Sequence, residues 1–174
     1  MTTPWAFPNT VTQYAESGAE NIHVPWEEVD SFSALKSFNL KNIKTTRDLV
    51  HIARDPRHDI LEKTYYLKAT NFSFINVPHS LSGIEMRLSM NRFGRITDDE
   101  IFLCLNNVTI GVNQADNILT PNKIYGSDID KWNTTLTSTD FQNTTFGVIV
   151  RFKSHPQWPH KCSALIDAIE LRLH

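Results

Sequence analysis

The sequence predicts an all-β protein, built as an antiparallel β-sandwich or barrel. From residue 62 onward, short segments rich in Val, Ile, Thr, Tyr and Phe are separated by turn residues, which is typical of consecutive short strands. Several segments alternate apolar and polar side chains with a period of two. Such alternation indicates strands with one face buried and one face in water, as in antiparallel sheets.

The clearest strand spans residues 83–91. Its predicted buried row is Ile84, Met86, Leu88 and Met90, and polar residues stand between them. A helix would place Met86 on the far side from Ile84 and Leu88, so the pattern favours a strand. A second alternating strand is expected at 145–153. Its predicted buried row is Phe146, Val148, Val150 and Phe152, with Arg151 and Lys153 on the other face.

Other strands are expected at residues 9–14, 62–74, 100–105, 108–112, 123–125 and 165–174. In 62–74 the alternation changes phase near Thr70 and Asn71, which predicts a β-bulge. Turns are expected at Asn106-Asn107 and at Gly126-Ser127. Residues 27–34 are expected to form a helical turn.

The closing segment, residues 162–173, fits two interpretations. A helix would gather Leu165, Ile166, Ile169 and Leu173 on one stripe, whereas a strand aligns Leu165, Ile169, Leu171 and Leu173. We favour the strand because residues 168–173 alternate without a break. Asp167 then falls on the apolar face, where its carboxylate needs a partner.

The 174 residues suit one domain with a substantial core. We expect residues 1–57 to form a less regular, partly extended arm, since Pro4, Pro8 and Pro25 punctuate it, and residues 58–174 to form the sandwich. The arm could wrap the domain or reach a neighbouring subunit. The sequence does not choose between these.

Composition argues against several classes of partner. The formal net charge is −2 and no basic run occurs, so we expect no nucleic-acid partner. No apolar run approaches the ~20 residues that span a bilayer. Nothing in the sequence resembles a signal peptide. The two cysteines, Cys104 and Cys162, are expected to be free thiols, and Cys104 is expected to be buried because it lies within an apolar run. The four N-x-S/T sequons are attributed to the Asn/Thr-rich composition.

Motifs of the common enzyme classes are missing from the sequence. There is no G-x-G-x-x-G, P-loop, G-x-S-x-G or H-E-x-x-H motif. We therefore expect a protein that is not an enzyme, with no cofactor. A carboxylate pair that meets only in space is left open as a minor alternative.

Two groups of residues have metal-ligand chemistry. His155, His160 and Cys162 suit zinc, but no fourth ligand stands nearby, so an exposed proline-fixed loop is the preferred interpretation. Acidic residues gather in two further places, at Asp98-Asp99-Glu100 and at Asp128 and Asp130. Neither place has EF-hand spacing, and turn chemistry is preferred for both.

Three aromatic residues in loop-rich segments are candidates for surface contacts: Tyr125, Trp132 and Trp158. Exposed aromatics can anchor a protein interface or stack on a sugar ring. They can equally plug the ends of a sandwich. Core or interface roles are preferred over glycan contact, because aromatics serve packing more often.

Several stretches together resemble a family of predicted structural proteins of tailed bacteriophages. They are residues 66–74 with Val77-Pro78, Ser82-Gly83-Ile84-Glu85, Ile124-Tyr125-Gly126-Ser127, Asp130-Lys131-Trp132 with 135–140, Thr145-Phe146-Gly147-Val148 and 166–171. More loosely, residues 9–12 resemble the opening strand and Trp26 the early tryptophan of that family. The likeness covers most of residues 62–174. Asn133 departs from it, since glycine usually follows the tryptophan, and residues 35–60 form a longer stretch than the family has.

The resemblance implies a jelly-roll-like sandwich in a virion, assembled in the host cytoplasm, in the tail, neck, baseplate or fibre-attachment region. It implies no catalytic residues. The partners it implies are other virion structural proteins, in a homo-oligomer. Two alternatives are kept, a carbohydrate-binding module for host attachment and, last, a hydrolase on a β-sandwich.

Overall fold

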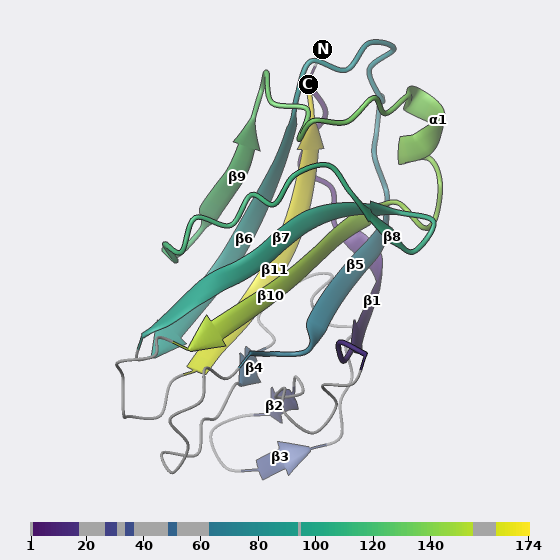
Figure 1. The fold of residues 1–174 in the computed structure, drawn as a ribbon. Coiled ribbons are helices and arrows are strands. Elements are labelled where there is room, and N and C mark those ends of the chain that lie inside the picture. The colour runs from purple at the N-terminus through teal and green to yellow at the C-terminus, as the bar shows by residue number, and fades with distance from the viewer. Residues whose placement is uncertain are drawn as a thin grey trace.

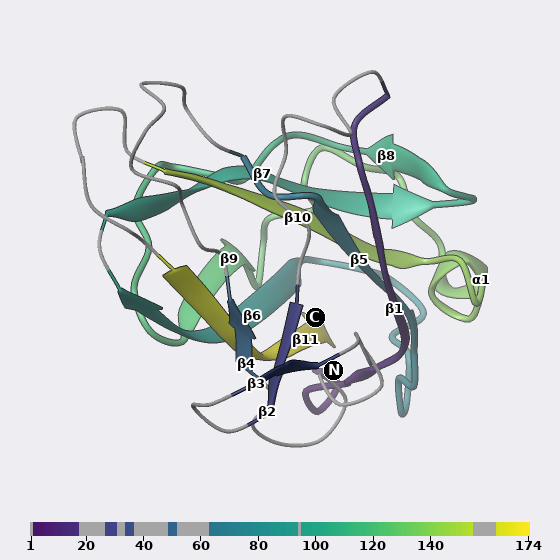
Figure 2. The same ribbon diagram turned by 90° about the horizontal axis from the view of Figure 1, so that it is seen from below.

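Two antiparallel sheets packed face to face form the body of the protein, which confirms the predicted all-β sandwich (Figures 1 and 2). The computed structural model describes residues 2–17, 27–30, 34–36, 49–51, 63–93, 95–154 and 163–174. Among these residues, no helix has the length and apolar character needed to cross a membrane.

The first sheet has five strands in the order β1-β5-β10-β7-β8. Their bounds are β1 Pro8–Tyr14, β5 Tyr66–Phe72, β10 Gly147–Ser154, β7 Ile96–Leu105 and β8 Val108–Ile110. The central strand β10 pairs with β5 on one side and with β7 on the other. Residues 147–152 of this strand are all buried, including Arg151.

The second sheet has the order β11-β6-β9. Its strands are β11 Ser163–Leu173, β6 Ile84–Phe93 and β9 Lys123–Ser127. The strand interpretation of the closing segment is thus confirmed, and the helical one is wrong. Strands β5, β6 and β7, and then β9, β10 and β11, lie alternately in the two sheets, which makes the sandwich jelly-roll-like.

The N-terminal residues belong to the sandwich. Ala6 forms a bridge with Leu171 at the edge of the second sheet, and β1 then pairs with β5 in the first sheet. Leu173 N donates to Thr3 Oγ1, so the two ends of the chain lie side by side (Figure 1). Residues 3–14 of the expected N-terminal arm therefore lie against the sandwich of the same chain.

A small third sheet replaces the helical turn expected at residues 27–34. Its order is β3-β2-β4, with β2 Glu27–Asp30, β3 Ala34–Lys36 and β4 Leu49–His51, and β4 lies against β11. Strand β2 pairs with segments on both sides. The pairing with β4 joins residues 27–29 to residues 49–51, and a local sequence pattern does not reveal such a partner.

Inward-facing rows from the two sheets form the core. The predicted row on β6 is confirmed, because Ile84, Met86, Leu88 and Met90 are all buried. The predicted row of Phe146, Val148, Val150 and Phe152 is confirmed in the same way. At one end, helix α1 (Ser138–Phe141) brings Phe141 edge-on to Phe146, with ring centroids 4.9 Å apart.

Two β-bulges change which side chains face the core. In β7 the pairing with β10 passes from Glu100 to Asp98, so Asp99 is the extra residue. In β11 the pairing with β6 passes from Ile166 to Ala168, so Asp167 is extra. Asp167 is half-buried and does not continue the buried row of Ile169, Leu171 and Leu173, which corrects its expected place on the apolar face.

The prediction of a β-bulge near Thr70 is wrong, because no extra residue is inserted in β5 there. Strand β5 keeps one register with β1, with Thr10 opposite Thr70 and Pro8 opposite Phe72. The phase of burial still changes there, from Leu67 and Ala69 to Thr70 and Phe72. Asn71 has a left-handed backbone, with φ 59°, and so changes the phase without an extra residue.

Asparagine makes many of the turns. Asn106 and Asn107 both have positive φ and join β7 to β8, which confirms the predicted turn. Five further asparagines have positive φ: Asn71, Asn76, Asn117, Asn122 and Asn133. Asn is the non-glycine residue that adopts this conformation most readily. Three of the four sequon asparagines, Asn71, Asn107 and Asn133, have positive φ, so backbone geometry accounts for asparagine at these positions.

Candidate functional site: a buried polar cluster around Asp98

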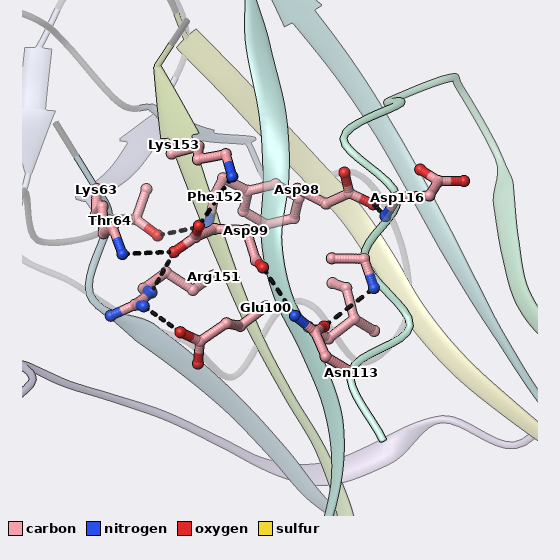
Figure 3. Close-up of polar contacts among 12 residues, drawn as sticks. Lys63, Thr64, Asp98, Asp99, Glu100, Asn113, Asp116, Arg151, Phe152 and Lys153 are labelled. Carbon is pink, nitrogen blue, oxygen red and sulfur yellow. Dashed lines mark hydrogen bonds and ion pairs between the residues drawn. The ribbon is translucent and has the colours of Figure 1, made fainter. Parts of the chain in front are cut away.

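Asp98 is a fully buried acid in the interior of the sandwich. It lies on β7 opposite Phe152 of β10, and its side chain is 0 % exposed. Because Asp99 is an extra residue, Asp98 and Ile101 are both buried although they are three residues apart, and Asp99 points outward. Figure 3 shows the two carboxylates leaving β7 in opposite directions, Asp98 toward Asp116 and Asp99 toward Lys63.

The two oxygens of Asp98 have very different surroundings. Oδ2 accepts from Lys123 Nζ at 2.9 Å, from the Tyr125 hydroxyl at 3.1 Å and from the Asp116 main-chain N–H at 3.3 Å. Oδ1 is buried and has no hydrogen-bond partner among the residues that the structure describes. A buried oxygen without a partner is costly, so this carboxylate is the unusual feature of the interior.

Strand β9 supplies the two side chains that face Asp98. Lys123 and Tyr125 are two residues apart in a strand and so point to the same side, whereas Ile124 points outward. Burial, followed by the charge of Asp98 and the hydrogen bond to it, raises the pKa of Tyr125. The hydroxyl therefore stays protonated and acts as a donor to Oδ2.

The Lys123 ammonium lies among oxygen atoms. Besides Asp98 it contacts the carboxylate of Asp116 and the main-chain oxygen of Ile118. It also lies 4.5 Å from the centre of the Tyr125 ring. Burial alone raises the pKa of Asp116, but hydrogen bonds from Lys123 and from the amide of Ile118 outweigh that effect and lower it. Asp116 is thus a second carboxylate on the same amine.

Trp132 closes the sandwich beside this cluster. It is 0 % exposed, and its φ of 55° is unusual for so large a residue. Asp130 Oδ1 accepts from the Trp132 amide at 2.7 Å, and Asp130 Oδ2 accepts from Gln114 at 2.9 Å. The aspartate thereby fixes the turn that inserts the indole.

Two of the three predicted aromatic residues, Tyr125 and Trp132, lie in the core. Both are buried, so neither ring is exposed at the surface of this chain. The reason is a pair of hydrogen bonds, since each ring has a polar atom that finds a partner inside, Asp98 for Tyr125 and Ile84 for Trp132. Trp158 lies outside the described residues.

Asp98, Asp99 and Glu100 are strand residues, so the turn interpretation is wrong for them. Asp99 and Glu100 point outward to Arg151, which donates to Asp99 at 2.9 Å and also pairs with Glu100 (Figure 3). Arg151 forms a further ion pair with Glu16. Lys63 and Lys153 each lie 3.1 Å from Asp99. These charges neutralise one another on the outer face of the first sheet. For Asp130 the turn interpretation is confirmed.

The part of the chain that the structure describes contains no candidate metal centre. No group of three or more His, Cys, Asp or Glu side chains there could hold a metal ion. His155, His160 and Cys162 lie outside the described residues. Cys104 is a free, buried thiol, as expected, and burial raises its pKa to about 12.

Sequence reasoning missed Asp98, Lys123 and Asp116 as one cluster. Lys123 and Tyr125 share a face of an expected strand, which was the only local signal. In the comparisons with known proteins, no family model, no curated protein and no solved structure matches the chain.

Proposed function

We propose that the protein is a non-enzymatic structural component of a tailed-bacteriophage virion that acts by protein–protein assembly. The region we propose is the tail, neck, baseplate or fibre-attachment region, and the partners are further copies of the chain and other virion structural proteins. The proposal rests on the sequence resemblance together with one structural observation, the exposed edge of the second sheet.

The edge strand β9 carries the structural argument. Within the described residues it pairs with β6 on one side and with no strand on the other. Ile124 on this strand is 48 % exposed, and Ile129, just beyond it, is 81 % exposed. Unpaired strand edges with exposed apolar side chains are where a further chain can add, through main-chain hydrogen bonds and side-chain contacts.

The residues that carry the resemblance also support a structural role. Tyr125 donates a hydrogen bond to Asp98, and Trp132 donates one to the main-chain oxygen of Ile84. The carboxylate of Asp130 accepts from the amide of Trp132 and so fixes the turn before it. Their work is to hold the strands together. A motif used in this way fits a scaffold protein better than an enzyme.

Assembly is tested by the mass of the full-length protein in solution, measured by light scattering over a concentration series. We expect a closed oligomer that dissociates when Ile124→Lys and Ile129→Glu are combined. The matched control is Val108→Lys, because Val108 is 61 % exposed on an edge strand of the other sheet. A wild-type monomer, or an oligomer that the double variant leaves intact, would contradict assembly through β9.

Membership of a particle is tested separately. Virions are purified from the host that carries the gene and their proteins are quantified by mass spectrometry. A fixed number of copies per particle is the expected result. Absence of the chain from the particles would overturn the virion proposal, whatever its oligomeric state.

Carbohydrate binding is the second candidate, and no observation on the described residues favours it. The aromatic rings expected to stack on a glycan are buried at Tyr125 and Trp132. Trp5 is half-buried and has the guanidinium groups of Arg87 and Arg172 over its ring, at 4.6 and 4.4 Å. We therefore place this candidate below assembly.

A further inference from the structure

We propose that Lys123 and Asp98 form an intramolecular amide bond that cross-links strands β9 and β7 inside the sandwich. The reacting atoms are already in contact, since Nζ lies 2.9 Å from Oδ2 of Asp98. Asp98 is 0 % and Lys123 10 % exposed, so the pair is shielded from bulk water. Held at such short range, the two groups react as one molecule, with a high effective concentration.

The surroundings of Asp98 match what attack on its Cγ requires. Negative charge develops on one oxygen when the carbon becomes tetrahedral, and Oδ2 already accepts from the Tyr125 hydroxyl and the Asp116 N–H. The other oxygen has to depart. Within the described part of the chain, Oδ1 has no hydrogen-bond partner that would hold it in place.

Asp116 supplies the proton transfers, because its carboxylate contacts the Lys123 ammonium. It relays one proton from Nζ to Oδ1 of Asp98, and the free amine then attacks Cγ of the neutral carboxyl group to form the C–N bond. A second proton passes from Nζ to Oδ1, the Cγ–Oδ1 bond breaks, and Oδ1 leaves as water. Asp116 ends as a carboxylate, so an ammonium and a carboxylate give an amide and one water.

The product removes an electrostatic cost. A buried ion pair retains a desolvation penalty that is repaid only when all its polar atoms have partners. In Asp98 one oxygen lacks such a partner, and the amide eliminates that atom together with both charges. The net reaction needs no oxidant or further reactant.

The test is the mass of the denatured wild-type chain and of its tryptic peptides. Between Arg95 and Lys123 the sequence has no other Lys or Arg, so trypsin releases residues 96–123 when Lys123 is free. Once Lys123 is an amide, cleavage there stops. We expect instead one peptide, residues 96–131, lighter than its sequence by one water.

Two variants make the result decisive. Lys123→Arg keeps a cation but has no primary amine, so it should have the full mass and be cleaved after residue 123. Asp116→Asn should lower the cross-linked fraction at a given time after refolding. Wild-type peptides of full mass with cleavage at Lys123 would overturn the proposal. So would loss of water with cleavage intact, because that indicates an imide within the chain and not a bond to Lys123. If Asp116→Asn forms the cross-link as fast as the wild type after refolding, the proposed role of Asp116 is overturned.

Discussion

The indole nitrogen of Trp132 donates a hydrogen bond of 3.0 Å to the main-chain oxygen of Ile84. The amide of Ile84 in turn donates to the oxygen of Asp130 at 2.8 Å. The first residue of β6 is therefore held through both its backbone groups by the loop that follows β9. A large aromatic side chain thus does the work of a neighbouring strand at this end of the sandwich, which explains why it tolerates a left-handed backbone.

Replacing Trp132 by Ala should lower the free energy of unfolding by about 3–5 kcal/mol, the usual cost of removing a buried aromatic. Urea denaturation followed by circular dichroism measures the change without relying on tryptophan fluorescence. Trp132→Phe keeps part of the ring but leaves the Ile84 oxygen without its donor, so an intermediate loss is expected. Phe7→Ala, which truncates an exposed aromatic ring, is the control. An alanine variant within about 1 kcal/mol of the wild type would contradict the closing role.

Gly126 should not accept any side chain. Its φ is +76°, and a Cβ there would lie 2.2 Å from the oxygen of Ile84 and 2.4 Å from Trp132 Nε1. Gly126→Ala should therefore cost about 2 kcal/mol or more, through backbone strain and displacement of the indole.

The double variant Gly126→Ala/Trp132→Ala separates these two causes. Removing the indole eliminates one of the two clashes, so the combined loss in urea denaturation should be smaller than the sum of the single losses. Strict additivity would show that the glycine and the tryptophan are energetically independent.

Period-two rows were predictable because they depend only on local chain geometry. The buried rows of β6 and β10 follow from the alternation of Ile84, Met86 and Leu88 and of Phe146, Val148 and Val150. Such rows face the core whichever strand lies beside them. The fold class followed from the sequence for that reason.

The polar cluster was not predictable, because a bulge is defined by a partner strand. Asp99 is an extra residue only relative to β10, and without that register Asp98 and Asp99 look alike in the sequence. The same holds for Asp167 relative to β6. Bringing Lys123 to Asp98 also requires the two sheets to face each other, which no local pattern contains.

Cys104 should be inert toward alkylating reagents in the folded protein. Its pKa of about 12 means that on the order of one thiol in 10⁴ is ionised at pH 8, and the side chain is buried as well. In a Cys162→Ser variant, where Cys104 is the only thiol, iodoacetamide labelling should follow the fraction unfolded across a urea titration. Rapid labelling without denaturant would contradict the burial of this thiol.

Asp99 should make the protein sensitive to acid. Burial by itself raises the pKa of Asp99, but the hydrogen bonds from Lys63 and Lys153 and the charge of Arg151 outweigh that effect and lower it. Since the folded pKa lies below the unfolded value of about 3.9, the ionised form stabilises the fold above that pH. This contribution is lost as the pH falls from about 4 through the folded pKa.

Asp99→Asn should therefore be less stable at pH 7 and should lose less stability between pH 4 and pH 2. Urea denaturation at a series of pH values measures both effects, and Asp128→Asn, which changes an exposed acid, is the matched control. Parallel pH profiles for Asp99→Asn and the wild type would show that the three cations stabilise no ionised carboxylate at this position.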